Sequence, residues 1–283
     1  MATSKTNPQS APAPAVESPG SSVSSVVKKK SPTRHFLSRL RSYFFYDPLI
    51  WSYTMVLGIL SLISSLFDRS GRVQHKFARL WSWLILKTIG VPVTVSGLDR
   101  VDTTRPHLYV ANHVSALDIP VLYVHLRFPF RIIAKSSIFR YPFVGWHLRR
   151  SGQIEVDKDN VRLAKRGLSQ AVETLRAGMP LVVFPEGGRS PDGQVKPFLG
   201  GAFYAAIRAG VDVVPLALVG TFEMLPMDTY HIQPRRVELL VGEPIPTQGL
   251  GPRDMDTLAA RTQKAVEDLY YSRSDLPDPR GKN

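Results

Sequence analysis

Hydrophobic positions in the second half of the chain recur with two different periods. Between residues 160 and 177 they fall three or four positions apart, which predicts an amphipathic helix, and the same spacing predicts another helix from about 253 to 272. Short runs rich in β-branched residues alternate with such segments and predict strands at 92–96, 107–111, 131–134, 153–156, 180–184, 212–219 and 236–242. Strands that alternate with helices indicate an α/β fold, with a mostly parallel or mixed central sheet flanked by helices.

Two apolar segments come before this pattern. Residues 49–67 carry no formal charge and, as a helix, would extend roughly 28 Å, about the thickness of a bilayer's hydrocarbon core. Residues 77–89 form a shorter amphipathic segment. Three arrangements fit: a helix 49–67 that crosses the bilayer, a helical hairpin of both segments that dips into one leaflet, or a buried core helix. Basic residues flank the first segment at both ends, so the positive-inside rule favours neither orientation of a helix that crosses the bilayer. We therefore favour the hairpin.

Composition narrows the classes of partner. Residues 1–33 are rich in Ser, Pro and Ala and are predicted to be disordered, and basic residues collect at the end of this tail. The net charge of +13 suits an anionic membrane face, phosphate ligands or nucleic acid. No helix-turn-helix, RNP aromatics or zinc spacing is recognisable, so we expect no nucleic acid partner. The chain has no cysteine and no histidine pair at metal-binding spacing, so neither a cysteine nucleophile nor a metal site is expected.

A histidine and an aspartate follow the predicted strand 107–111. His113 comes directly after this strand, and Asp118 stands five positions later. If the chain turns between them, the carboxylate can bind one ring nitrogen, fix the tautomer and leave the other nitrogen as a base. Taken alone, this spacing is a weak signal.

A second group follows the predicted strand 180–184, where the chain reads Phe, Pro, Glu186, Gly187, Gly188, Arg189, Ser190. Paired glycines permit a tight turn and close approach of a ligand to the backbone. Arg189 presents a planar fork that suits phosphate oxygens, and Glu186 is predicted to hold that fork in place.

Together, the N-H-x-x-x-x-D and F-P-E-G-x-R-S motifs resemble those of the glycerolipid acyltransferase family, whose best-known members are 1-acylglycerol-3-phosphate acyltransferases. The resemblance covers roughly residues 90–245 and includes two weaker motifs, 151–158 and 213–217. Two departures stand out. Lys158 stands where the family commonly has Arg, which keeps the charge and loses the bidentate geometry, and Gly188 replaces the more common Thr or Ser.

The resemblance implies a reaction and roles for these residues. His113 and Asp118 would be catalytic, and Glu186, Gly187, Arg189 and Lys158 would bind the acceptor's phosphate. The acyl group would pass from acyl-CoA or acyl-carrier protein, as co-substrate, to the sn-2 hydroxyl of lysophosphatidic acid, with no further cofactor. Ser115 and Ser190 lie outside any G-x-S-x-G elbow, so direct attack is expected in place of a serine-bound acyl group. The alternatives are another acceptor (glycerol-3-phosphate, another lysophospholipid or a lyso-ornithine lipid) or a non-catalytic lipid-binding protein.

These predictions give an organisation for the whole chain. The expected parts are a disordered tail (1–33), a basic segment with a membrane-anchoring helical hairpin (34–90), an acyltransferase domain (91–273) and a polar C-terminal tail (274–283). We expect the protein to associate with the cytoplasmic face of a membrane. Acyl-chain length preference and oligomeric state have no signature in the sequence.

Overall fold

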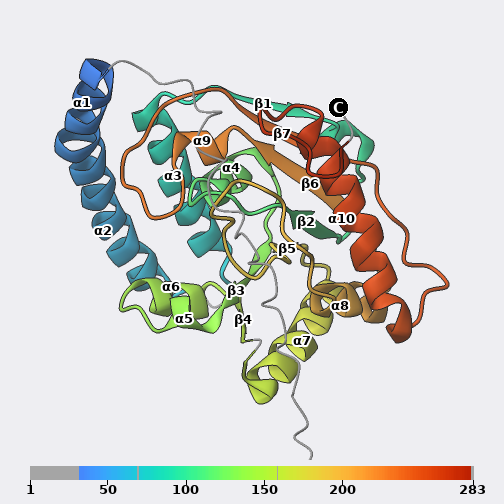
Figure 1. Ribbon diagram of the computed structural model, residues 1–283. Helices are drawn as coiled ribbons and strands as arrows, with labels where there is room; N and C mark the ends of the chain where they lie inside the picture. Colours follow the sequence, from blue (N-terminus) through green and yellow to red (C-terminus); the bar gives the residue numbers. More distant parts are fainter. Residues whose placement is uncertain (1–31, 69, 158, 282–283) are drawn as a thin grey trace, which may run out of the picture.

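The computed structural model describes residues 32–281 except 69 and 158, and it is built around a seven-stranded sheet (Figure 1). The strand order is β1-β7-β6-β2-β5-β3-β4. Only the pairing of β6 with β7 is antiparallel among these strands, so β1 and β7 run against the other five. The strands are β1 Val93–Ser96, β2 Leu108–Ala111, β3 Arg131–Lys135, β4 Ile154–Val156, β5 Leu181–Val183, β6 Val213–Val219 and β7 Val237–Val241. All seven predicted strands are present, and the α/β fold with a mixed sheet is confirmed.

Helices fill the connections between the strands. The structure contains α1 Pro32–Arg41, the π-helix η2 Ser42–Tyr46, α2 Asp47–Ser64, α3 Arg72–Ile89, α4 Asp118–His125, α5 Ser136–Phe139, α6 Val144–Arg150, α7 Val161–Arg176, α8 Gly201–Ala209, α9 Thr221–Met224 and α10 Met255–Tyr271, with 3-10 turns η3 Leu98–Arg100 and η4 Pro252–Asp254. The predicted helix 160–177 is α7. Asn160 caps its start by accepting hydrogen bonds from the Arg162 and Leu163 backbone N–H groups, each at 3.1 Å.

Apolar side chains cover both faces of the sheet, which makes three layers. The alternation along β2 shows the division: Tyr109 and Ala111 face one core with α3 and α4, whereas Leu108 and Val110 face the other with α7, α8 and α10. All four residues of β2 are fully buried. The carboxyl end of β2 therefore lies at the centre of the molecule, and the residues that follow it are attached to a fully buried strand.

The two apolar N-terminal segments form an antiparallel helical pair, but the two helices have different surroundings. The inner helix, α3, contributes Ile85, Leu86 and Ile89 to the core against the sheet. The outer helix, α2, packs on α3, and the Trp81 indole N–H donates to Thr54 Oγ1 at 2.8 Å between them. The segment 77–89 is thus one face of the domain core as well as the inner half of the hairpin.

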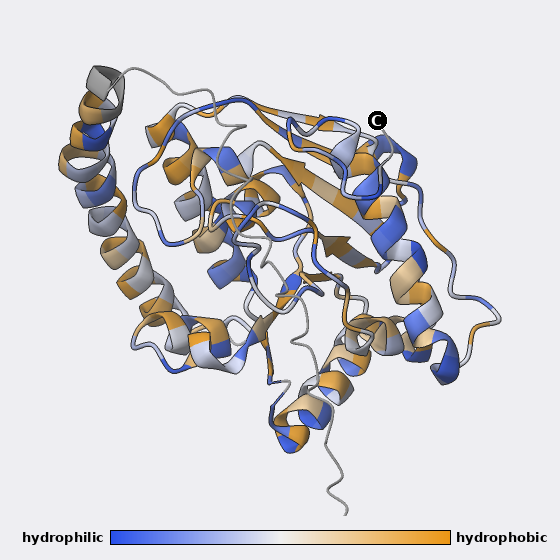
Figure 2. Cartoon of the chain, viewed as in Figure 1, coloured by the Kyte–Doolittle hydropathy of each residue, from blue (hydrophilic) through white to orange (hydrophobic). Residues whose placement is uncertain are grey.

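Most of the outer helix is uncovered by protein. Helices α1, η2 and α2 run on continuously, and within the described residues one helix, Phe36–Ser64, is long and apolar enough to cross a membrane by length and composition. Almost none of that helix is buried, and Figure 2 shows apolar residues along it. Residues 1–31 of the predicted disordered tail, including its lysines, lie outside the described residues, and the last two residues of that tail begin α1.

Candidate active site

The two sequence motifs meet at one edge of the sheet. β2 and β5 are parallel neighbours, with Val110 beside Val183, so their carboxyl ends lie side by side. Asn112 fixes the end of β2 against β6, because its side chain accepts from the Leu218 N–H at 2.8 Å and donates to the Leu218 carbonyl at 3.1 Å. His113, next after Asn112, and Glu186, just past β5, are thereby brought together although 73 positions separate them.

The predicted contact between His113 and Asp118 is present. His113 Nδ1 lies 2.8 Å from Asp118 Oδ2, and the same oxygen accepts from the Val114 and Ser115 backbone N–H groups, each at 2.8 Å. Asp118 is fully buried and is the first residue of α4, where the helix dipole also favours a negative charge. The His113 side chain keeps 15% of its surface exposed. This arrangement places the ring proton on Nδ1 and leaves Nε2 free to accept another proton.

The backbone of His113 is held by the second motif. Its N–H donates to Glu186 Oε1 at 2.8 Å, and its carbonyl accepts from the Ser190 N–H at 2.8 Å. The imidazole also stacks on the Phe184 ring, with centroids 4.1 Å apart. Three contacts from one loop therefore fix the position and the plane of the His113 ring.

Glu186 does not have the partner that the sequence predicts. We expected its carboxylate to orient the Arg189 guanidinium, but it lies beneath the turn and accepts the His113 N–H instead. The reason is burial: the turn encloses Glu186, whereas Arg189 is only half-buried. Burial also raises the pKa of Glu186 to about 8, against the opposing effect of the hydrogen bond from His113. Glu186 is thus placed to position His113.

Two basic residues belong to the Gly-Gly turn and its surroundings. Gly187 has φ 71°, a left-handed conformation that favours glycine, and Arg189 follows it. The sequence analysis did not single out Lys196, yet its Nζ donates to the Arg189 carbonyl at 3.2 Å and its charge acts on Glu186. No motif marks Lys196, because a loop rather than a regular element returns it to the turn. Lys158 lies outside the described residues.

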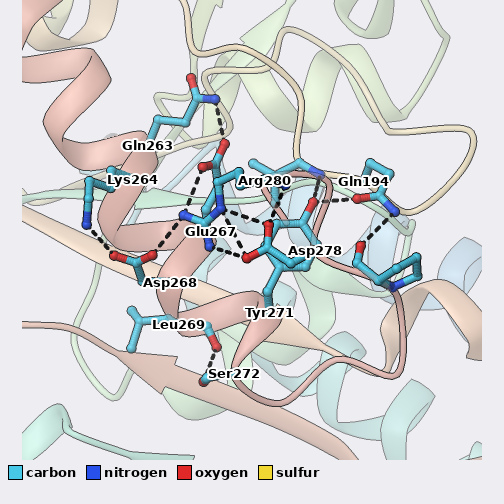
Figure 3. Close-up of polar contacts among 12 residues, drawn as sticks. Gln194, Gln263, Lys264, Glu267, Asp268, Leu269, Tyr271, Ser272, Asp278 and Arg280 are labelled. Carbon is cyan, nitrogen blue, oxygen red and sulfur yellow. Dashed lines mark hydrogen bonds and ion pairs between the residues drawn. The ribbon is translucent and has the colours of Figure 1, made fainter. Parts of the chain in front are cut away.

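The loop that carries Lys196 is braced by the C-terminal part of the chain. Tyr270 Oη donates to the Gly193 carbonyl at 2.9 Å, and Tyr271 Oη donates to Gln194 Oε1 at 2.6 Å. Figure 3 shows how Arg280, which bonds to both Asp278 and Asp268, ties the C-terminal segment to α10 beside these contacts. Residues far apart in sequence thus stabilise the loop that returns Lys196 to the Gly-Gly turn.

The two serines of the motifs have other partners. Ser115 Oγ donates to the Leu225 carbonyl at 2.8 Å, and Ser190 Oγ donates to Asp192 Oδ1 at 2.8 Å. Both residues are fully buried. A serine nucleophile needs an exposed hydroxyl paired with a base, and neither of these serines has that geometry.

Comparisons with known proteins agree with this geometry. Residues 92–219 match the family model named Acyltransferase. The chain is 31% identical over 239 residues to a 1-acyl-sn-glycerol-3-phosphate acyltransferase of Chlamydomonas reinhardtii, covering 81% of this chain and 69% of that protein. It is 34% identical over 215 residues to a chloroplastic enzyme of the same name from Arabidopsis thaliana, covering 74% of this chain and 60% of that protein.

A solved structure gives the same result for the fold. The crystal structure of the 1-acyl-sn-glycerophosphate acyltransferase PlsC from Thermotoga maritima matches with a TM-score of 0.64 and 28% identity, over 84% of this chain and 96% of that one. Sequence similarity and fold therefore agree over most of the chain. The chain belongs to the 1-acyl-sn-glycerol-3-phosphate acyltransferase family of O-acyltransferases.

Proposed function

We propose that this protein transfers a fatty acyl group from acyl-CoA or acyl-carrier protein to the sn-2 hydroxyl of lysophosphatidic acid, giving phosphatidic acid, with His113 as the general base. The observation that carries the proposal is the 2.8 Å contact between His113 Nδ1 and the buried Asp118 carboxylate. Binding alone needs no oriented base, so this contact favours catalysis over a lipid-binding role.

The chemistry follows from the free nitrogen. His113 Nε2 takes the proton of the sn-2 hydroxyl as its oxygen attacks the thioester carbonyl carbon. The carbon–sulfur bond then breaks, and the leaving thiolate takes up the proton from the imidazolium. Asp118 stabilises the imidazolium between these two steps, because its charge lies against Nδ1 and is buried from water.

The cations over the turn suit the acceptor's phosphate. Arg189 would bind phosphate oxygens through its planar guanidinium, with Gly187 allowing close approach to the backbone and Lys196 adding a second charge. Glu186 would act indirectly by holding His113. Lys158 remains a further candidate for this phosphate.

Membrane association is part of the same proposal. The exposed apolar helix Phe36–Ser64 supports anchoring at a lipid surface, where the acceptor and the product reside. We place the enzyme on the cytoplasmic face, because acyl-CoA and acyl-carrier protein are cytoplasmic thioesters and the basic N-terminal segment suits anionic lipid.

The test uses the purified full-length chain. Phosphatidic acid formation is measured with lysophosphatidic acid and either donor, for wild type, for His113→Ala, and for His125→Ala as a matched histidine at the other end of α4. We expect activity in wild type and His125→Ala and none in His113→Ala. Glycerol-3-phosphate, other lysophospholipids and a lyso-ornithine lipid serve as competing acceptors; a faster reaction with one of them would reassign the substrate. Full activity of His113→Ala would refute the proposed base.

A further inference from the structure

A patch of exposed apolar side chains lies outside the N-terminal hairpin. It consists of Ile138, Tyr141, Phe143, Val144 and Trp146, in and between α5 and α6, and is called here the α5–α6 patch. Its aromatic members leave 64% (Tyr141), 45% (Phe143) and 53% (Trp146) of their surfaces exposed. Exposed apolar groups of this size, gathered in one place and rimmed by charge, mark surfaces that bind another apolar phase.

The fold holds this patch outward by specific contacts. Phe139 is buried, its carbonyl accepts from Arg149 Nη1 at 2.8 Å, and Gly145 passes so close beneath it that a side chain there would collide with that carbonyl. Ser136 hydrogen-bonds Asp157 and anchors the start of α5. Phe143 has φ 61°, a conformation that costs energy for an aromatic residue. These contacts hold α5 and α6 against each other and against β4, so the aromatic side chains between and after them are turned away from the core.

The patch lies beside α2, whose outward side chains are apolar. Helices α2 and α6 pack together, and Ser61 Oγ lies 2.9 Å from His147 Nδ1 across their contact (Figure 1). On α2 itself, Val56 and Ile63 are exposed on the same unburied helix. The patch also follows β3, whose carboxyl end lies at the same edge of the sheet as those of β2 and β5, after which His113 and Glu186 stand.

Charge identifies the occupant. Between residues 135 and 150 the chain carries Lys135, Arg140, Arg149 and Arg150 and no acidic residue. Arg149 pairs with Glu155 at 3.8 Å, and the charges of Lys135 and Arg140 act on Asp157, so the four cations exceed the two acids beside them. Two copies of this net positive surface would repel each other, whereas aromatic side chains with basic neighbours suit the interface of an anionic bilayer. We propose that the α5–α6 patch is a second membrane-contact element, which inserts its aromatics into an anionic lipid surface beside α2. This inference rests on the membrane association proposed above and deepens it.

The absence of cysteine from the chain permits a direct test. Single cysteines replace Tyr141, Trp146, Ile59 on α2, or Lys264 on α10, in the full-length protein, and each carries a nitroxide label. Collisional access of the label to oxygen and to a water-soluble nickel complex is measured with and without vesicles of phosphatidylcholine containing phosphatidylserine. Ile59→Cys reports whether the hairpin is in the membrane, and Lys264→Cys reports a site on the opposite helical layer.

We expect labels at 141, 146 and 59 to lose access to the nickel complex and gain access to oxygen when vesicles are added, while the label at 264 stays in water. Insertion at 59 with labels 141 and 146 still in water would overturn this inference and leave the proposed membrane association intact. Labels at 59, 141 and 146 that all stay in water would refute both. Concentration-dependent immobilisation of labels 141 and 146 without vesicles would instead show a contact between copies, and it too would overturn the inference.

Discussion

Replacing Asp118 by Asn tests the centre of the proposed mechanism with a change of one atom. Asp118 Oδ2 accepts from His113 Nδ1 and from two backbone N–H groups, while Oδ1 is buried with no hydrogen-bond partner among the described residues. An asparagine keeps these three hydrogen bonds only by placing its oxygen at the Oδ2 position. Its NH₂ group then takes the Oδ1 position, where a buried donor without a partner costs about 1–3 kcal/mol of stability.

The loss of charge should affect the reaction more than the fold. With a 2.8 Å contact between Nδ1 and Oδ2, the charges of imidazolium and carboxylate are centred roughly 4 Å apart, which at an effective dielectric constant of about 20 is worth about 4 kcal/mol. This attraction exists only when His113 is protonated, during proton transfer. Its removal should therefore lower kcat about 10³-fold, since each 1.36 kcal/mol corresponds to about tenfold. KM for the acceptor should change little.

The assay is phosphatidic acid formation at saturating donor, with kcat and KM determined for wild type, Asp118→Asn and the exposed control Asp99→Asn, which lies in the short turn η3. Thermal unfolding of each variant shows whether the fold is retained. We expect Asp99→Asn to match wild type. A folded Asp118→Asn enzyme whose kcat stays within about tenfold of wild type would mean that the carboxylate does not stabilise an imidazolium, and the general-base role of His113 would be withdrawn.

Three further predictions concern Glu186, the basic residues of the turn and the outer face of α2. In the folded wild type the pKa of Glu186 is raised from 4.5 to about 8, so the folded protein binds one more proton than the unfolded chain between these values and its free energy of unfolding falls as pH rises through this window. Glu186→Gln should remove this pH dependence. Denaturant unfolding of both proteins at several pH values measures it. Arg189→Ala should raise KM for lysophosphatidic acid about 10- to 100-fold with a smaller change in kcat, because a hydrogen bond to a charged group is worth about 1.5–3 kcal/mol. Lys196→Met should raise KM less. An unchanged KM in both variants would place the phosphate elsewhere. Val56→Glu on α2 should weaken binding to vesicles in flotation, whereas Ala260→Glu on the exposed side of α10 should not. If the two variants bind vesicles equally, α2 does not contact the lipid.

The sequence by itself determined the class of fold and the identity of the motifs. Period-two and period-3.6 patterns report which elements form and which of their faces is apolar, and these patterns placed all seven strands and the helix Val161–Arg176 nearly to the residue. The spacing of His113 and Asp118 was also sufficient for their contact, because both belong to one short turn between β2 and α4.

Only the tertiary structure decided what each element packs against. Apolar periodicity in residues 77–89 does not distinguish lipid from protein as the covering phase, and α3 in fact covers the sheet with Ile85, Leu86 and Ile89. The α5–α6 patch was not predicted for the same reason, since its aromatic residues resemble core residues until their exposure is known.

The site shows the same limit. Glu186 was predicted to hold Arg189, its neighbour in the chain, but it binds the His113 backbone, and Lys196 joins the turn through a loop braced by α10. Local spacing determines contacts within one turn, where the backbone geometry is nearly fixed. Contacts between turns depend on how parallel strands bring their carboxyl ends together and on which side chains that packing buries, and these are properties of the folded chain as a whole.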